Sequence, residues 1–208
     1  MRNVKFQVSS NSGGEMEILV KPCGEFQTNC YIIDKKIIID PGMGAFEFVK
    51  ENVKKPLAII NTHGHFDHIW DDKKIKEYFN IPIFIHKKDA FFLEKDPFGF
   101  NPPKIKPDVL IEEGEYKIGD FDVKIRHFPG HTPGSITVEI GENMFSGDFV
   151  FEGSIGRVDL PYSNALQMKK SIEKFLKIPY DKRVLPGHGP ATTIKKAQKF
   201  LPMWLDCL

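Results

Sequence analysis

Residues 62–68 concentrate side chains that could bind metal ions. They read Thr-His-Gly-His-Phe-Asp-His, which places three imidazoles and one carboxylate within six consecutive residues of a chain that has only seven histidines. Neutral imidazole nitrogens and carboxylate oxygens are the ligands that Zn²⁺, Fe²⁺ and Mn²⁺ prefer in proteins. A lone histidine is more often structural, but donors packed this closely are unfavourable unless a cation lies among them. The pattern therefore predicts that His63, His65, Asp67 and His68 bind metal.

The flanking residues predict that this cluster lies on a loop between a buried strand and a helix. Residues 57–61 form a short apolar run, which is typical of a fully buried strand. Residues 69–79 carry apolar side chains at roughly helical spacing. Sheets in α/β proteins place their chemistry at the carboxyl ends of strands. The predicted position of the cluster is therefore that of a functional site.

The motif His-x-His-x-Asp-His after a buried strand resembles the metallo-β-lactamase superfamily. Three later segments resemble further motifs of that family in the same order: residues 128–135 (FPGHTPGS), 145–148 (FSGD) and 186–189 (PGHG). The resemblance spans nearly the whole chain. It implies a four-layer αβ/βα sandwich, in which two mixed β-sheets pack together and helices cover their outer faces.

The resemblance also implies a centre of two divalent metal ions, with zinc expected and iron or manganese as alternatives. The implied ligands are His63, His65 and His131 for one ion, Asp67, His68 and His188 for the second, and Asp148 as a bridge. The chemistry agrees, because seven protein ligands are too many for one tetrahedral ion. A hydroxide that bridges two such ions can attack a carbonyl near neutral pH. Asp67 and Asp148 are thus the expected catalytic carboxylates.

Asp40 lies at the end of a predicted strand over residues 36–39, directly before Pro41 and Gly42. The resemblance implies a carboxylate that orients the ligand loop from behind. A strand-terminating Asp-Pro-Gly turn accounts for the same residues, and the two interpretations are compatible.

The segment after Asp148 indicates which group within this superfamily the chain resembles. Residues 153–157, Gly-Ser-Ile-Gly-Arg, with Asp159 two positions later, resemble glyoxalase II-like proteins, the hydroxyacylglutathione hydrolases, in a short single-domain form. This implies a metal-dependent hydrolase that cleaves thioesters, with Arg157 and Tyr162 as the expected substrate-binding residues. Alternatively, Arg157 pairs with Asp159 and braces its loop. The helical C-terminal segment that helps to bind glutathione in that family has no counterpart here, so the thiol half of the substrate stays open.

Two functions from other classes remain as alternatives. A persulfide dioxygenase has a similar Gly-Arg-x-Asp loop but uses a single iron ion, so metal content and oxygen consumption would distinguish it. A non-catalytic binding module braced by metal would contain the ions and cleave no ester, thioester, lactam or phosphodiester.

The composition points to a small-molecule substrate. The chain has 29 basic and 28 acidic residues, which favours neither a nucleic-acid partner nor a membrane surface, and no apolar window has the length of a membrane span. Three cysteines without a Cys-x-x-Cys pair fit a reducing cytoplasm. Nothing in the sequence indicates an oligomeric state.

The remaining pattern predicts one domain over residues 16–208, preceded by residues 1–15 as a leader or an edge strand. Strands are expected at 18–20, 30–33, 36–39, 57–61, 81–85, 109–111, 116–118, 121–127, 136–140, 144–146 and 183–185, and helices at 46–53, 69–79, 87–93, 165–176 and 193–200. His86 and His127 are expected to be structural, and Cys23 and Cys30 to pack in the core. A further hypothesis is an apolar lid made of Phe91, Phe92, Phe98 and Phe100.

Overall fold

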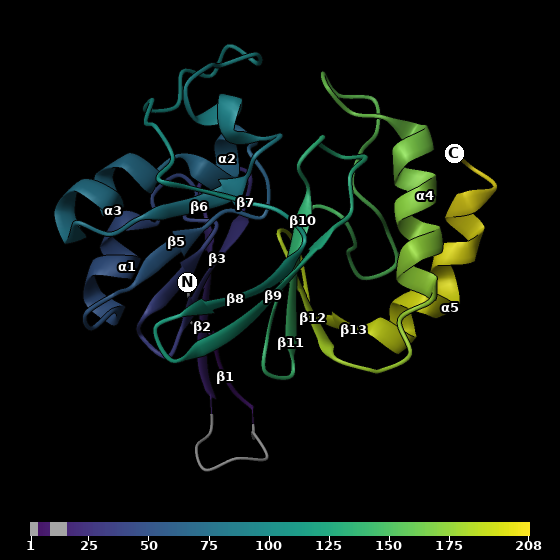
Figure 1. Cartoon of the computed structure of the whole chain (residues 1–208), viewed down its shortest axis with the longest axis horizontal. Helices are drawn as coiled ribbons and strands as arrows, with labels where there is room; N and C mark the ends of the chain where they lie inside the picture. Colours follow the sequence, from purple (N-terminus) through teal and green to yellow (C-terminus); the bar gives the residue numbers. More distant parts are fainter. Residues whose placement is uncertain (1–3, 9–15) are drawn as a thin grey trace.

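The computed structural model describes residues 4–8 and 16–208, which form two mixed β-sheets packed face to face (Figure 1). In order across the first sheet, the strands are β1 (Val4–Val8), β2 (Met16–Cys23), β3 (Thr28–Ile33), β4 (Ile37–Ile39), β5 (Ala58–Ile60), β6 (Ile83–His86) and β7 (Val109–Ile111). Strands β1 to β4 pair antiparallel, and β4 to β7 pair parallel.

The second sheet is antiparallel except for one pair. Its strands, in order across the sheet, are β13 (Thr192–Thr193), β12 (Arg183–Pro186), β11 (Asn143–Gly147), β10 (Ile136–Ile140), β9 (Phe121–His127) and β8 (Gly114–Ile118). The parallel pair is β11 and β12.

Helices cover the outer face of each sheet (Figure 1). The first sheet carries α1 (Phe46–Asn52), α2 (Phe66–Ile69), α3 (Asp72–Phe79) and a 3₁₀ turn, η1 (Ala90–Leu93). The second sheet carries α4 (Ala165–Leu176) and α5 (Ile194–Leu205). The order is thus helices, sheet, sheet, helices, which confirms the predicted αβ/βα sandwich.

The alternation of side chains along each strand creates the layers. On β4, Ile37 and Ile39 face the core between the sheets, whereas Ile38 faces the helices, and all three are fully buried. Because both faces of the strand are covered, it appears in the sequence as an uninterrupted apolar run. On the other side of the molecule, Val184 of β12 packs with Phe175 of α4. Within the described ranges, the buried side chains therefore form three apolar cores, one between each pair of neighbouring layers.

Some local predictions differ from the structure. The helix predicted over residues 69–79 is divided into α2 and α3, because Asp71 is held by tertiary hydrogen bonds. Its N–H donates to the carbonyl of Pro41 at 3.0 Å, and its Oδ2 accepts from the N–H of Phe46 at 2.8 Å. The helix predicted over 87–93 is the shorter η1, and the last helix extends beyond residue 200 to Leu205.

At the N-terminus, residues 4–8 of the predicted segment 1–15 form β1 at the edge of the first sheet. The rest of that segment lies outside the described residues. Across the described part of the chain, none of the helices combines the length and the apolar composition needed to cross a bilayer.

Candidate metal centre

The side chains predicted to bind metal meet at one end of the sandwich, although they come from four separate loops, the first of which continues into α2 with Asp67 and His68. Each loop follows a strand: β5 precedes His63, His65, Asp67 and His68, β9 precedes His131, β11 precedes Asp148, and β12 precedes His188. The first loop belongs to one sheet and the other three belong to the second sheet. The centre therefore lies where the two sheets meet.

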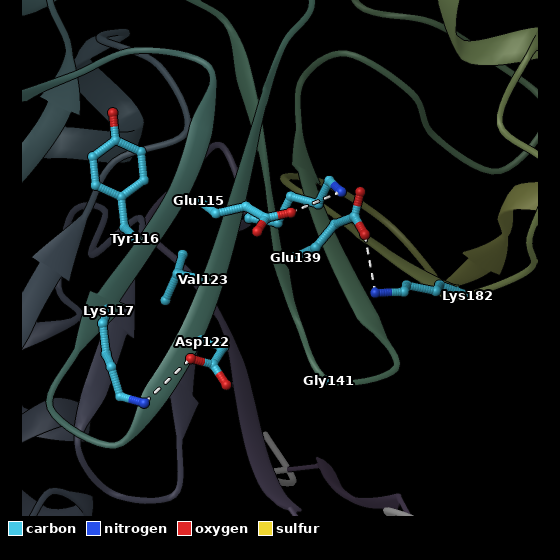
Figure 2. Close-up of a pocket in the computed structure, with 9 residues that line it drawn as sticks. Glu115, Tyr116, Lys117, Asp122, Val123, Glu139, Gly141 and Lys182 are labelled. Atoms are coloured by element: carbon cyan, nitrogen blue, oxygen red, sulfur yellow. Dashed lines mark hydrogen bonds and ion pairs between the residues drawn. The ribbon is translucent and has the colours of Figure 1, made fainter.

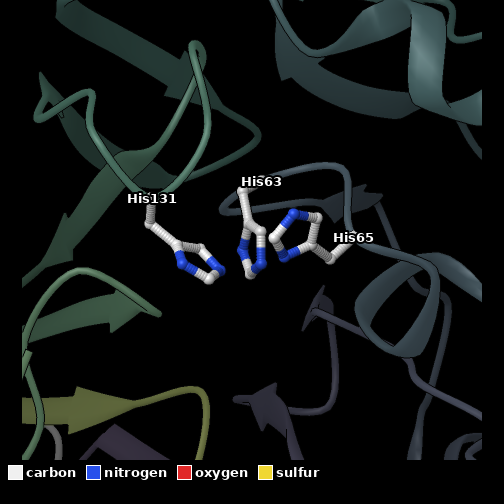
Figure 3. Close-up of side chains that lie close together, drawn as sticks. All are labelled: His63, His65 and His131. Atoms are coloured by element: carbon white, nitrogen blue, oxygen red, sulfur yellow. The ribbon is translucent and has the colours of Figure 1, made fainter. Parts of the chain in front are cut away.

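His63, His65 and His131 form the first group of donors. One nitrogen from each ring lies within 4.8 Å of the others, and all three residues are at most 5 % exposed. Figure 3 shows the three rings gathered from two different loops. Among the described residues, none hydrogen-bonds to the Nε2 atom of any of these rings. Buried polar atoms without partners are rare in proteins, so these three nitrogens fit a metal ligand set.

Hydrogen bonds at the opposite ring nitrogen fix the tautomer of two of these histidines. His131 Nδ1 lies 2.8 Å from the carbonyl oxygen of Arg157, which can only accept a hydrogen bond. His63 Nδ1 lies 3.1 Å from the hydroxyl oxygen of Thr62, and that hydroxyl already donates to Asp40. Both histidines therefore carry their proton on Nδ1 and present a lone pair at Nε2.

Asp67, His68 and His188 form the second group. His68 Nδ1 donates to Asp40 Oδ2 at 3.0 Å, and His188 Nδ1 donates to the carbonyl oxygen of Phe26 at 3.0 Å. Their Nε2 atoms consequently face each other at 3.3 Å. Two lone pairs at that distance repel each other unless a positive charge, either a proton or a metal ion, lies between them.

Asp148 connects the two groups. Its Oδ1 lies 3.3 Å from His68 Nε2, and its Oδ2 lies 3.5 Å from both His131 Nε2 and His188 Nε2. It thus contacts members of both groups, as a bridging carboxylate would.

The pKa shifts show the same demand for positive charge. Burial lowers the pKa of His65 to about 3, so this imidazole stays neutral at physiological pH. Burial also acts to lower the pKa of His188, but hydrogen bonds to Asp148 and Asp67 outweigh it and raise that pKa to about 9. For Asp67, burial would raise the pKa, yet the neighbouring His68 charge and hydrogen bonds lower it to about 2. His188 therefore binds a proton at physiological pH, and divalent cations would supply this positive charge among the imidazoles and ionised carboxylates instead.

The Asp40 carboxylate orients these ligands through hydrogen bonds to Thr62 and His68. Its Oδ1 accepts the N–H of Thr62 at 2.8 Å, and its Oδ2 accepts the Thr62 hydroxyl and His68 Nδ1. Although an oxygen of Asp40 also lies near ring nitrogens of His63 and His68, these hydrogen bonds already occupy the carboxylate. Its backbone φ of +48° also makes the sharp turn before Pro41. Both interpretations of Asp40 from the sequence therefore describe the structure.

Asp89 is a positioning residue that the sequence analysis missed. This fully buried carboxylate accepts the N–H of Gly64 at 2.9 Å, the hydroxyl of Thr132 at 2.6 Å and the N–H of Gly134 at 2.6 Å. It thereby ties the loop that carries His63 and His65 to the loop that carries His131. No motif marks it, because its partners are far away in the sequence. Similarly, the Thr28 hydroxyl donates to Asp67 Oδ2 at 2.7 Å.

Two motif glycines are required by close packing. A Cβ atom on Gly187 would overlap Asp148 Oδ1 and lie 2.6 Å from His68 Cε1. A Cβ atom on Gly64 would lie 2.5 Å from the Phe92 ring. Any side chain at either position would displace metal-binding residues or their immediate support.

A pocket of about 460 Å³ opens onto the centre. Arg157 lines it, but its guanidinium pairs with the Asp159 carboxylate through Nε–Oδ1 and Nη2–Oδ2 contacts of 2.9 and 2.8 Å. Arg157 thus lies at the pocket, where a substrate-binding residue would be expected, and it is also paired with Asp159 as in the alternative interpretation. Tyr162 is not among the lining residues, and its ring packs on Phe91 and Phe92 with centroids 5.1 and 5.7 Å apart.

The other residues singled out in the sequence lie at or outside the edge of this pocket. Of the four phenylalanines expected to form a lid, Phe98 and Phe100 line it. The rings of His86 and His127 stack on each other at 4.1 Å, and His127 Nε2 donates to the carbonyl of Pro133. Cys23 and Cys30 are buried in the core between the first sheet and its helices.

A larger hollow of about 570 Å³ on the second sheet has a different character (Figure 2). Its charged side chains form separate ion pairs, Lys117 with Asp122 at 3.5 Å and Lys182 with Glu139 at 2.9 Å. They do not converge on a common point, so this surface lacks the chemistry of the first pocket.

Comparison with known proteins agrees with this geometry. A model of the metallo-β-lactamase superfamily matches residues 23–188. The chain is 35% identical to the hydroxyacylglutathione hydrolase GloC of Haemophilus influenzae over 206 residues, which cover 90% of this chain and 97% of that protein. This chain therefore belongs to the metallo-β-lactamase superfamily.

Two solved structures resemble the whole domain. The BLEG-1 B3 metallo-β-lactamase superposes with a TM-score of 0.82 and 34% identity, covering 90% of this chain and 99% of that one. The protein TTHA1623 in a di-iron-bound form superposes with a TM-score of 0.72 and 30% identity, covering 95% and 99%. The fold and the donor set together are those of the metal-dependent hydrolases.

Proposed function

We propose that this chain is a binuclear metal-dependent hydrolase that cleaves thioesters of the hydroxyacylglutathione type. The observation that carries the proposal is the convergence of two donor groups on Asp148. In the first group, the three Nε2 atoms have no hydrogen-bond partner among the described residues. The similarity to GloC of Haemophilus influenzae supports the choice of thioesters over other carbonyl substrates.

Each side chain has a defined part in this proposal. The first ion would be held by His63, His65 and His131, the second by Asp67, His68 and His188, with Asp148 between them. When bound, the ions would supply Lewis acidity, which activates water near neutral pH and stabilises the developing oxyanion. Asp67 and Asp148 supply the negative charge that retains the cations, and both can accept a hydrogen bond from the attacking water.

Zinc is the ion that we expect, and iron or manganese would suit the same nitrogen and oxygen donors. The resemblance to a di-iron-bound structure makes iron a concrete alternative. We further propose that the substrate is a small molecule and that the protein works in the cytoplasm. The free thiols of Cys23, Cys30 and Cys207 are compatible with a reducing compartment.

The test combines metal quantification on the purified chain with turnover of S-lactoylglutathione. We expect two metal ions per chain, and we expect a chelator to remove activity that added metal restores. His65→Ala and Asp148→Ala should each abolish hydrolysis and leave a folded, metal-depleted protein. Full activity of Asp148→Ala would refute the binuclear mechanism.

Other outcomes would favour the alternatives. One iron per chain, with oxygen consumed in the presence of glutathione persulfide, would indicate a dioxygenase. Two bound ions without cleavage of any thioester, ester, lactam or phosphodiester would indicate a binding module.

A further inference from the structure

The pocket above the metal centre has two unlike walls. One wall consists of donors from the centre itself. The rest of the lining is apolar except for Arg157 and consists of Phe26, Phe66, Phe98, Phe100, Phe151, Ile155 and Leu160. We call this set the apolar wall. It is assembled from the turn after β2, from α2, and from loop residues around 98–100 and 151–160.

The rings of the apolar wall pack on one another at the mouth of the pocket. Phe66 and Phe100 stack with centroids 3.8 Å apart and an interplanar angle of 15°. Phe26 meets both of them edge-on, with centroid distances of 5.0 and 6.0 Å. Phe98 meets the ring of His65 edge-on at 5.0 Å. The apolar surface is thus continuous with the first group of metal donors.

Two of these rings remain largely open to solvent. Phe26 and Phe100 are each 48% exposed. A contiguous exposed apolar surface that borders a polar centre is a common feature of ligand sites, because a ligand gains free energy by covering it. The apolar group of such a ligand would lie close to the ions that activate the carbonyl.

The same pocket offers little unpaired positive charge to an anionic ligand. Among the described lining residues, Arg157 is the cationic side chain apart from the imidazoles of the centre. Asp159 already binds its guanidinium through two contacts. A substrate carboxylate would have to compete with Asp159, whereas an apolar group would meet no competitor.

We propose that the apolar wall binds an aromatic or bulky apolar acyl group beside the scissile carbonyl. This inference rests on the proposed thioesterase function and specifies its substrate class. The preferred substrates are aryl-substituted 2-hydroxyacyl thioesters, and the lactoyl thioester is cleaved less efficiently because its methyl group covers little of the wall.

A matched pair of substrates tests this inference on the metal-loaded full chain. S-mandeloylglutathione and S-lactoylglutathione share the thiol and the 2-hydroxyl group and differ by a phenyl for a methyl. After division by the rate of hydroxide-catalysed hydrolysis of each, we expect kcat/KM to be about 100-fold higher for the mandeloyl thioester. Equal values for the two substrates would overturn the inference.

Substitutions in the apolar wall test whether these residues cause the substrate preference. Phe100→Ala should lower kcat/KM for the mandeloyl thioester by about tenfold and lower the lactoyl value less, so that the preference for the mandeloyl thioester falls. The control is Tyr78→Ala, which removes an aromatic ring that is 56% exposed on α3 and absent from the pocket lining. An unchanged substrate preference in Phe100→Ala, and also in Phe26→Leu, would overturn the assignment to the wall.

A binding measurement separates failure of this inference from failure of the proposed function. The reaction products, mandelate and lactate, are titrated into the metal-loaded protein by calorimetry, which needs no turnover. We expect mandelate to bind at least tenfold more tightly, and Phe100→Ala to reduce the difference. If neither thioester is cleaved but mandelate still binds more tightly, the thioesterase assignment fails and the apolar subsite stands. Equal affinities would refute the subsite.

Discussion

Four of the five imidazoles in this centre have their Nδ1 atom hydrogen-bonded to an oxygen. The partners differ: a carboxylate for His68, a hydroxyl for His63, and main-chain carbonyls for His131 and His188. Each bond fixes the tautomer that leaves Nε2 free. Asp40 controls two of the four, His68 directly and His63 through the hydroxyl of Thr62. Residues that contact the imidazoles from the side away from the centre thus determine which ring nitrogen each imidazole presents to an ion.

Asp40→Asn tests this control. The amide keeps the shape of the side chain but places a donor where the carboxylate accepts three hydrogen bonds, so His68 and Thr62 lose their orientation. We expect metal affinity to fall by about 10- to 100-fold while the far-ultraviolet circular dichroism stays unchanged. Titration against a competing chelator measures the change. Wild-type affinity in the variant would show that Asp40 is only a turn residue.

Gly187→Ala tests the close packing beneath His68. The added methyl group overlaps Asp148 Oδ1, so we expect the bridging carboxylate to move and metal-dependent activity to fall by at least tenfold. Gly114→Ala is a matched control, because its Cβ atom would meet nothing closer than 3.7 Å. The prediction fails if both variants keep the metal content and activity of the wild type.

At the scale of elements, the loops that carry the ligands are held by buried side chains that follow other strands. Asp89, just after β6, receives donors from the loop after β5 and from the loop after β9. Burial raises its pKa to about 6, which shows how much desolvation its hydrogen bonds must offset. The apolar wall is likewise assembled by several loops. The strands and helices form the scaffold, and the loops between them position the residues of the site.

Asp89→Ala tests how strongly the ligand loops depend on the hydrogen bonds to this carboxylate. The substitution removes the acceptor of three donors that are buried or nearly so. We expect the free energy of unfolding to fall by about 3 kcal/mol and metal affinity to fall as well. Urea denaturation and metal titration measure the two effects. As a control, Asp96→Ala removes a carboxylate that accepts hydrogen bonds only within its own loop, from Phe98, Gly99 and Asn101. Equal stabilities for the two variants would contradict the proposed role of Asp89.

At the scale of the whole molecule, a buried charge holds the second sheet to the segment before β12. Glu139 on β10 is 2% exposed. It accepts from Arg126 of β9 at 2.6 Å, from the Tyr180 hydroxyl at 2.9 Å and from Lys182 at 2.9 Å. Burial alone would raise its pKa, but Lys182 and Arg126 hold the pKa below its ordinary value of 4.5. This network braces the sheet that supplies His131, Asp148 and His188.

The lowered pKa of Glu139 sets the sign of a pH effect. Because the pKa is lower in the folded state, the stabilising contribution is complete above pH 4.5 and is lost as pH falls through the folded pKa. We expect Glu139→Gln to be less stable than the wild type by roughly 3 kcal/mol at pH 7, and the gap to narrow on acidification. Urea denaturation of both proteins without metal, from pH 7 to pH 3, tests this. A gap that does not depend on pH would refute the account.

The sequence by itself predicted the fold class, which the structure confirms, and seven candidate metal donors, which the structure brings close together. It could do so because strand alternation and ligand spacing are local patterns, and each motif directly follows a strand. The break at Asp71 and the role of Asp89 depend on hydrogen bonds between distant segments, so no local pattern reveals them.

Only the tertiary structure decided which imidazole nitrogens face inward and that the guanidinium of Arg157 is paired with Asp159. It also decided the second wall of the pocket. Phe26, Phe66 and Phe151 look like core residues in the sequence, because an aromatic side chain does not indicate which cavity it will face. Packing the two sheets face to face brings these residues together beside the metal donors, and the proposed substrate preference depends on this arrangement.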